Sequence, residues 1–412
     1  MTVDDRLRDA LHRRADAVVP SQPEWSRVAG RFVPPARRRR RAGVTSVVGA
    51  VVVVVAAVLV STRGGSDRPQ EVRTAGTPAT TVPESPSARP APALAPSSGP
   101  VPAGFQPVSV TWVSTRQGWV LGTAPCADRR CPALIRTTDG GSSWAGIPAP
   151  PAGVDGITGV RFADERNGWI YGINAIGVWA THDGGATWRH LDTPPGEVSS
   201  LEAGAGRVWA VARSTASYVY TSTVGTDDWR SAGSEPMFGT GVVLQGPIAY
   251  IAGADGVLLA ISPAGLERRG LPCPQAGVEL AGAGSDIVAV CTHGAAAGSS
   301  FKTLVRSSDG GRTWTAAGAP PSGGSVRGVA AASRTTIVVA AVSGASWLYR
   351  TDDGGQTWAT VYTELGGGTP LDDLTFTDAA RGFVVTRGPA GDGRLLLTTD
   401  SGRTWLPVTF GP

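Results

Sequence analysis

The chain has 412 residues, with 37 Lys or Arg against 33 Asp or Glu and a formal net charge of +4. The basic excess lies at one end, because residues 1–42 hold 11 Arg and 5 acidic residues, which leaves 26 basic and 28 acidic residues elsewhere. A nearly neutral remainder excludes the broad basic surface of a nucleic-acid-binding domain, so we expect no nucleic-acid partner. With 56 Gly, 32 Pro and no long helical periodicity after residue 107, most of the chain is predicted to be all-β.

Residues 1–41 are predicted to be a short, basic, helical tail. Two helices are expected within residues 1–33, and the second carries Trp25 and Phe32 on one face. One interpretation is a tail that rests near the membrane. The sharper interpretation is a docking element for a cytoplasmic protein partner, since exposed aromatic and aliphatic side chains are costly in water.

The next segment, Ala42–Ser61, is predicted to be a transmembrane helix. Its 20 residues carry no charge and are dominated by Val, which is enough to cross about 30 Å of hydrocarbon. Five arginines, Arg37–Arg41, precede it, so the positive-inside rule places residues 1–41 in the cytoplasm and everything after Thr62 outside the cell. A cleaved secretion signal is the alternative, but the charged region before it is long and no small-x-small cleavage site follows.

Residues 62–107 are predicted to be an extended linker. The segment holds ten prolines among Ala, Ser and Thr, a composition that cannot form a packed core. We therefore expect it to hold the rest of the chain away from the bilayer.

Five copies of one phrase, Ser/Thr-x-Asp-x-Gly-x-Ser/Thr-Trp, follow. In such a turn the Asp carboxylate can accept local backbone N–H bonds, the Gly can adopt a positive φ, and the Trp begins the next strand. The positions are Asp139, Gly141 and Trp144; Asp183, Gly185 and Trp188; Asp309, Gly311 and Trp314; Asp353, Gly355 and Trp358; Asp400, Gly402 and Trp405.

The spacing of these copies predicts a propeller. Trp144 and Trp188 are 44 residues apart, as are Trp314 and Trp358, and Trp405 follows 47 residues later. This is the period of one four-stranded blade.

Two further repeats complete the count. A worn copy runs from Thr221 to Trp229, and the segment Ser262–Glu267 occupies the place of a missing copy. The region 108–412 is therefore predicted to be a seven-bladed β-propeller.

Short hydrophobic strands confirm the frame of the repeats. Phrases such as Gly118–Gly122, Gly168–Gly172 and Gly382–Val385 stand about 20 to 25 residues before the turns. Each blade should therefore contain strand A, strand B with this phrase, strand C ending at the turn, and strand D beginning near the Trp. The first strand is expected to begin near Val108 and the last to end near Phe410.

The four cysteines all follow the predicted span, which fits an oxidising compartment. Cys126 with Cys131, and Cys273 with Cys291, are the natural local disulfide pairs, although two other pairings remain open. Spacings of five and eighteen residues argue against a zinc site, so no metal is expected.

From Val108 to Phe410 the chain resembles the Asp-box (BNR repeat) propellers of the sialidase-like superfamily. These include sialidases, sortilin-type receptors, xyloglucanases and the photosystem II stability/assembly factor family, and the paired strand and turn phrases are most similar to the last family and its bacterial relatives. The resemblance implies that each box folds the turn between strands C and D, at the outer rim and away from the ligand face. It also implies that the box aspartates are structural and that their tryptophans pack within and between blades.

The resemblance to sialidases does not extend to their catalytic residues. The Arg-Ile-Pro phrase of that family is missing from this chain, and the one Tyr–Glu pair worth naming, Tyr362 and Glu364, is expected in the loop after the sixth blade without an Arg triad. Another glycosidase would need two facing carboxylates. The candidates on loops, among which no spacing singles out a pair, are Asp155, Asp192, Glu197, Glu235, Glu364, Asp372 and Asp392.

The most distinctive loop expected on the ligand face is Ala124–Pro132. A disulfide between Cys126 and Cys131 would present Arg129 and Arg130 to carboxylates or to an acidic partner surface. The alternative is a stapled loop whose charges are merely solvated.

These features predict a single-pass membrane protein that displays a binding, scaffold or assembly module outside the cell, without catalysis or a cofactor. A protein or polysaccharide ligand would bind the central face of the ring. An extracytoplasmic glycoside hydrolase is the first alternative. The second is a transmembrane sensor whose layout resembles membrane anti-sigma factors, although their His-x-x-x-Cys-x-x-Cys motif does not occur here.

Overall fold

The computed structural model describes residues 98–411, apart from 175, 214–216, 234–240, 254–255, 274–276 and 389–392. The chain divides into two compact units, Met1–Pro86 and Ser87–Pro412, and the described residues all belong to the second. The predicted tail, the predicted span and most of the linker lie outside the described residues. No helix in the described part is long and apolar enough to cross a membrane.

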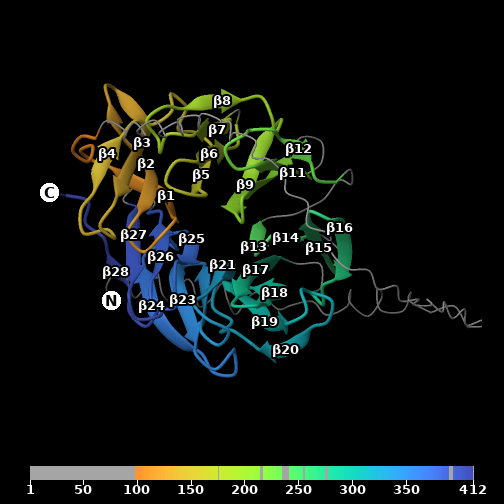
Figure 1. The fold of residues 1–412 in the computed structure, drawn as a ribbon. Helices are drawn as coiled ribbons and strands as arrows, with labels where there is room; N and C mark the ends of the chain where they lie inside the picture. Colours follow the sequence, from red (N-terminus) through yellow and green to blue (C-terminus); the bar gives the residue numbers. More distant parts are fainter. Residues whose placement is uncertain are drawn as a thin grey trace, which may run out of the picture. The chain divides into compact units, whose positions relative to one another are not determined.

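The described residues form seven four-stranded antiparallel sheets arranged around a central axis, which confirms the predicted seven-bladed β-propeller (Figure 1). Blades 1 to 3 contain β1 (Gln106–Trp112), β2 (Gly118–Cys126), β3 (Arg129–Thr137) and β4 (Ala145–Ile147); β5 (Ile157–Phe162), β6 (Gly168–Gly172), β7 (Gly177–Thr181) and β8 (Arg189–Leu191); and β9 (Glu197–Gly204), β10 (Arg207–Arg213), β11 (Ser217–Thr223) and β12 (Arg230–Ser231). Blades 4 and 5 contain β13 (Val242–Gln245), β14 (Ile248–Ala252), β15 (Val257–Ser262) and β16 (Gly265–Gly270); and β17 (Val278–Ala283), β18 (Asp286–Ala296), β19 (Ser299–Ser307) and β20 (Thr315–Gly318). Blades 6 and 7 contain β21 (Ser325–Ala331), β22 (Ile337–Val342), β23 (Ala345–Thr351) and β24 (Ala359–Leu365); and β25 (Leu371–Phe376), β26 (Gly382–Thr386), β27 (Arg394–Thr398) and β28 (Leu406–Pro407).

The first strand of each blade lies nearest the axis and the fourth lies at the periphery (Figure 1). The inner strands β1, β5, β9, β13, β17, β21 and β25 contact one another in this order, and β25 contacts β1. Among the described residues, each inner strand pairs with a neighbouring strand on one edge only, and its other edge faces the axis.

The hydrophobic core is divided among the seven junctions between neighbouring blades. Successive side chains of a strand point to opposite faces of its sheet, so one strand supplies two junctions. On β2, Trp119 and Leu121 pack against blade 2, whereas Val120 packs against blade 7. This double burial explains the wholly apolar Gly-Trp-hydrophobic-hydrophobic-Gly phrase, because the second strand of a blade has no face in water.

The ring closes without strand exchange between its first and last blades. All four strands of blade 7 come from the C-terminal part of the chain, and they meet blade 1 through side chains. Trp112 stacks on Phe383 with ring centroids 4.6 Å apart, and Phe105 meets Phe410 edge to face at 5.3 Å. Just before β1, Gly99 exchanges two 2.9 Å backbone hydrogen bonds with a residue of β4.

The two weak repeats form blades without a complete box. The worn copy supplies the connection between β11 and β12, where Trp229 is buried between blades 2 and 3. In blade 4 the connection is a tight turn between Ser262 and Gly265, which pair directly.

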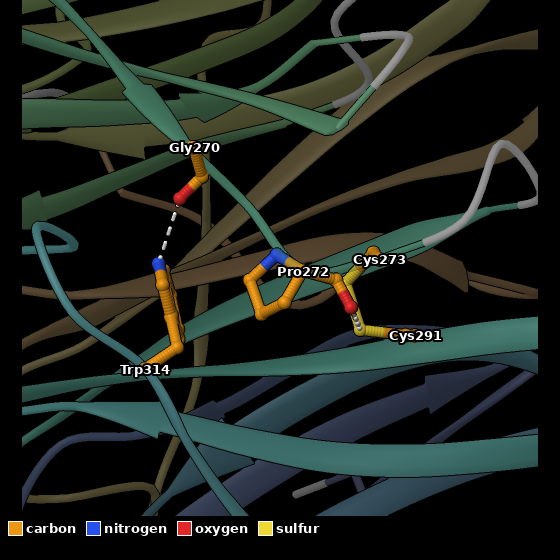
Figure 2. The surroundings of a disulfide bond; sticks show 5 residues. All are labelled: Gly270, Pro272, Cys273, Cys291 and Trp314. Atoms are coloured by element: carbon orange, nitrogen blue, oxygen red, sulfur yellow. Dashed lines mark hydrogen bonds between the residues drawn. A yellow bond between two sulfur atoms is a disulfide. The ribbon is translucent and has the colours of Figure 1, made fainter. Parts of the chain in front are cut away.

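Both predicted disulfides are present and use all four cysteines. Cys126–Cys131 closes the hairpin between β2 and β3. Cys273–Cys291 joins the connection between blades 4 and 5 to β18 (Figure 2). Beside it, Trp314 of blade 5 donates its indole N–H to the carbonyl of Gly270 in blade 4, at 3.0 Å.

Candidate functional site

A polar cavity of about 340 Å³, which we call the axial cavity, lies among the inner strands of the ring. Its walls come from β1, β5, β9 and β25, the inner strands of four consecutive blades, and from the residues that follow β1 and β25. The lining uses the last residues of these strands, so the cavity lies toward the end of the axis at which strands A turn into strands B. This end is opposite the hairpin between β2 and β3, where the ligand face was predicted.

Three charged side chains meet in this cavity, each from a different blade. The Arg161 guanidinium donates from Nε to Glu202 Oε1 at 2.7 Å and from Nη2 to Asp373 Oδ1 at 2.8 Å. A third bond joins Arg161 Nη1 to the backbone carbonyl of Val160 at 2.8 Å. Arg161 therefore joins blades 2, 3 and 7 at the centre of the ring.

Asp373 also binds blade 1. Its Oδ2 accepts the backbone N–H of Val110 at 3.0 Å and the hydroxyl proton of Ser109. Asp373 has a φ of +53° at a bulge where the pairing of β25 with β26 shifts, a conformation that Asp tolerates better than most residues. The bulge lets this carboxylate reach across to a neighbouring blade.

Burial acts differently on the two carboxylates. Desolvation raises the pKa of Glu202, and Arg161 opposes this rise only in part. Burial also opposes ionisation of Asp373, but the charge of Arg161 and the hydrogen bonds outweigh it and hold the pKa of Asp373 below its usual range. Burial disfavours the Arg161 cation too, yet its two carboxylates raise the pKa of Arg161 well above its ordinary value.

A second charged row follows the inner strands of blades 5, 6 and 7. Arg327 lies 3.6 Å from Asp372, whose other oxygen pairs with Arg387 at 2.9 Å. In blade 5, burial raises the pKa of Glu279 to about 7, and the charge of Arg327 opposes this rise. Asp372 thus pairs with one arginine from the inner strand of blade 6 and with one from its own blade.

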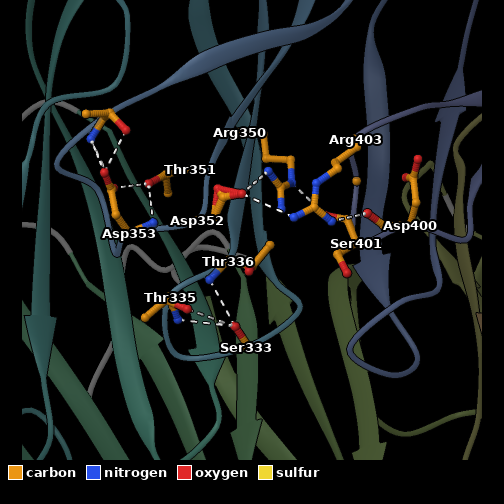
Figure 3. A network of polar contacts seen from close by, with 12 residues as sticks. Ser333, Thr335, Thr336, Arg350, Thr351, Asp352, Asp353, Asp400, Ser401 and Arg403 are labelled. Carbon is orange, nitrogen blue, oxygen red and sulfur yellow. Dashed lines mark hydrogen bonds and ion pairs between the residues drawn. The ribbon is translucent and has the colours of Figure 1, made fainter.

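The five repeated turns share one hydrogen-bond pattern. In blade 6 the Thr351 hydroxyl donates to Asp353 at 2.7 Å (Figure 3). The same hydroxyl accepts the N–H of Gly355 at 2.9 Å. The backbone N–H and hydroxyl of Thr357 donate to the same carboxylate at 3.0 and 2.6 Å. The equivalent bonds recur around Asp139, Asp183, Asp309 and Asp400.

These bonds leave the turn carboxylates ionised and satisfied. Hydrogen bonds from Thr357 hold the pKa of Asp353 well below its usual range. None of the five aspartates is among the residues that line the axial cavity. Asp309 instead borders a cavity of about 610 Å³ between blades 4 and 5, with Tyr250 and Arg312.

The tryptophans of the turns lie within and between blades. Trp358 and Trp405 donate their indole N–H to the turn carbonyls of Gly355 and Gly402 at 3.0 and 3.1 Å. Trp188 of blade 2 reaches back to a backbone carbonyl of blade 1, as Trp314 does from blade 5 to blade 4.

An arginine from one blade often holds the turns of the next. Arg350 of blade 6 donates from Nε to the carbonyl of Ser401 in blade 7 at 2.7 Å and pairs with Asp352 at 2.9 Å (Figure 3). Arg381 of blade 7 likewise donates to the carbonyl of Gly140 in blade 1.

The Arg pair predicted on the ligand face divides into two different environments. The Arg129 side chain is exposed and forms no hydrogen bond or ion pair with any described residue. Arg130 folds back, with bonds to Thr123 at 2.8 Å and to the carbonyl of Gly104 at 3.0 Å. Only Arg129 is therefore free to contact a ligand.

The Tyr362–Glu364 pair lies on β24, the outer strand of blade 6, and not in the loop after that blade. The Tyr362 hydroxyl donates to Glu364 at 3.1 Å, and Glu364 is also bound by Thr369 and by Arg394 of blade 7. Burial and the Glu364 charge raise the pKa of Tyr362 to about 12, which opposes its use as a nucleophile. No hydrogen bond or ion pair among described residues joins this pair to Arg129.

Sequence reasoning missed the axial cluster of Arg161, Glu202 and Asp373. A weak signal exists at Arg161, a charged residue between the apolar Val160 and Phe162 of β5. The partners of Arg161 lie 41 and 212 residues away along the chain, and no local pattern connects them.

No family model matches the chain, and no curated protein matches it. Among solved structures, YCF48 bound to a D1 peptide is 16% identical, with a TM-score of 0.53, over 74% of this chain and 96% of that one. YCF48 from Cyanidioschyzon merolae is 18% identical with the same TM-score, over 74% of this chain and 98% of that one. YCF48 is a photosystem II assembly factor, so these likenesses match the family that the repeats resemble. At these identities they show the fold.

Proposed function

We propose that this propeller is a non-catalytic binding or assembly module that takes a protein partner at its axial cavity. The carrying observation is the cavity itself, whose wall combines four blades and a charged cluster fixed by short hydrogen bonds. A cavity of about 340 Å³ is at the small end of the range for ligand pockets, roughly 300 to 1,000 Å³. The YCF48 structure with a D1 peptide supports a peptide or protein as the ligand class.

Fixed side chains suit this role. Asp373 and Arg161 have little freedom to move, because each is bound by several groups from different blades. A partner therefore meets a preformed surface and loses little affinity to ordering it.

We further propose that the chain is a single-pass membrane protein with the propeller outside the cell. The support is the uncharged segment Ala42–Ser61 after five arginines, together with two disulfides in the propeller. The full-length chain should then stay with the membrane fraction after a high-salt wash and enter solution in detergent. Recovery of a soluble secreted form would refute this topology.

A glycoside hydrolase is the second candidate, and the opposite pKa shifts of Glu202 and Asp373 favour it. Pairs of this kind supply the acid and base of glycosidases. Against it, both oxygens of Asp373 are already engaged by Arg161 and blade 1. The full chain should release no sugar from a glycan panel, and release that Glu202→Gln abolishes would favour the hydrolase.

Panning a phage-displayed heptapeptide library against the full chain in detergent tests the binding proposal. Peptides should be enriched, and their binding should be lost in Ala203→Leu, which fills the cavity wall. It should persist in Ala264→Leu, a matched change in the exposed turn of blade 4. Failure to enrich any peptide, or equal binding to both variants, would refute a partner site on the axis.

A further inference from the structure

We propose that the axial cavity selects a positively charged side chain, Lys or Arg, presented by the partner. This inference rests on the proposed function, because it names the chemistry by which the same cavity recognises its ligand. It follows from the charges, the unused acceptor and the size of the cavity.

The cluster holds more negative than positive charge. Arg161 carries one positive charge, and Glu202 and Asp373 together carry two negative charges when ionised. A buried excess of one sign is costly unless another charge or several hydrogen bonds compensate it. An incoming cation would balance the cluster.

The unused capacity belongs to Glu202. Asp373 has bonds at both oxygens, whereas Glu202 has only its Oε1 bonded among the described residues. The Glu202 side chain is 30% exposed, against 15% for Asp373. Its second oxygen is thus the accessible charged acceptor of the cluster.

The raised pKa of Glu202 agrees with this assignment. Desolvation in the cluster disfavours the charged form of this carboxylate, and a bound ammonium or guanidinium group would offset that cost. Arg161 repels a second cation, but it is paired with both carboxylates, and its side chain is 17% exposed against 30% for Glu202.

The size and lining of the cavity suit one long side chain. Thr111 and Thr375 are among the lining residues, and the inner strands β1 and β25 have unpaired edges that offer backbone carbonyls. The lining continues into Ser114 and Thr377, beyond the ends of these strands. The side chain therefore enters from the face that carries the turns between strands A and B.

The experiment uses the heptapeptides that the full chain enriches. The peptides should share an Arg or Lys, and resynthesis with citrulline for Arg, or norleucine for Lys, should weaken binding at least about tenfold. Glu202→Gln, which keeps an acceptor for Arg161 but removes the charge, should weaken the parent peptides similarly. Glu197→Gln, at the other end of β9, should bind as the unchanged chain does.

The possible results separate this inference from the proposed function. Enriched peptides without a basic residue, or peptides indifferent to both citrulline and Glu202→Gln, would overturn the inference and leave a binding module. Enrichment of no peptide would overturn both. If Glu202→Gln fails to fold, Glu202→Asp should still weaken basic peptides, because the shorter side chain withdraws the carboxylate; unchanged binding would count against the inference.

Discussion

The carboxylate of the aspartate in each repeated turn accepts hydrogen bonds from residues of the same turn. In the last blade, Asp400 accepts the N–H of Thr404 at 2.9 Å and the hydroxyl protons of Thr404 and Thr398 at 2.7 and 2.8 Å. Partial burial opposes ionisation, but these bonds outweigh it and lower the pKa of Asp400 to about 2. Such a carboxylate stabilises the turn, and its low pKa makes it a poor proton acceptor near neutral pH.

The stability that Asp400 supplies should vanish in acid. Its folded pKa is below the ordinary value of 3.8, so the contribution is complete above about pH 4 and is lost as the pH falls toward 2. Asp400→Asn should therefore lower the unfolding temperature at pH 7, and the difference from the unchanged chain should shrink below pH 4. Calorimetry between pH 2 and 7 measures this, with exposed Asp155→Asn as the control. A difference independent of pH would contradict the assignment.

Glu279 on the axial wall should show the opposite pH dependence. Burial raises its pKa from 4.5 to about 7, so the folded chain holds this proton more tightly than the unfolded chain. The free energy of unfolding should fall as the pH rises from about 4.5 to 7, by on the order of 2 kcal/mol. Glu279→Gln should remove that fall, so the variant should be more stable than the parent at pH 8 and no more stable at pH 4. Denaturant unfolding of both proteins at pH 4 and pH 8 measures this difference. A free energy of unfolding that is the same at both pH values in the unchanged chain would refute the prediction for Glu279.

At the scale of elements, the blades are joined by side chains that reach from one blade into the turns of the next. Besides Arg350 and Arg381, a carboxylate in the worn turn of blade 3, that of Asp227, is bound by His182 at 2.8 Å and Arg189 at 2.6 Å, both from blade 2. A glycine can be equally necessary there: Gly355 has a φ of +110°, and a Cβ on it would lie 2.6 Å from a blade 5 carbonyl. The turns are therefore interfaces as well as connections.

Arg350→Met should loosen the junction of blades 6 and 7. Arg350 is 5% exposed, and its loss leaves the carbonyl of Ser401 and the carboxylate of Asp352 without this donor. The expected cost is about 1–3 kcal/mol, with faster hydrogen exchange in blade 7. Arg403→Met, at a more exposed contact to the same Asp352, should cost less than about 1 kcal/mol. Equal effects in denaturant unfolding would argue against a specific role for Arg350.

The sequence predicted the strands better than it predicted the axial site, for a physical reason. The second strand of each blade is buried on both faces, so its sequence, such as Gly118–Gly122, is a continuous apolar run that can be recognised without knowing its partners. The partners of polar residues on the inner strands cannot be predicted from local sequence, because those partners come from other blades and are brought near only when the ring closes. For the same reason Arg129 and Arg130, adjacent in sequence, could not be told apart until Thr123 and Gly104 were seen to bind only the second.

At the scale of the whole molecule, stability depends on seven junctions, and the disulfides reinforce them unequally. Cys273–Cys291 links residues 18 apart, and it joins the connection between blades 4 and 5 to a strand of blade 5. Cys126–Cys131 links residues only 5 apart within one hairpin of blade 1. A longer closed loop removes more entropy from the unfolded chain.

The two disulfides should therefore contribute unequally to the free energy of unfolding. Replacing Cys273 and Cys291 with Ala should cost about 3 kcal/mol, against about 2 kcal/mol for Cys126 and Cys131, by the loop-entropy relation. The first pair also leaves space in a core, because Cys291 is fully buried. Thermal unfolding of the two double variants under oxidising conditions compares them; a larger loss for the short loop would contradict this order.

The contact between Phe105 and Phe410 brings the beginning and the end of the propeller to one place. Every blade is also contiguous in the chain, so the order of blades along the polypeptide is a matter of where the circle is cut. A circular permutant that joins residue 411 to residue 98 and opens instead between β20 and β21 would keep all seven junctions. The axial cavity is lined by blade 7 and blades 1 to 3, which lie at opposite ends of the present chain. In the permutant these four blades would follow one another along the polypeptide.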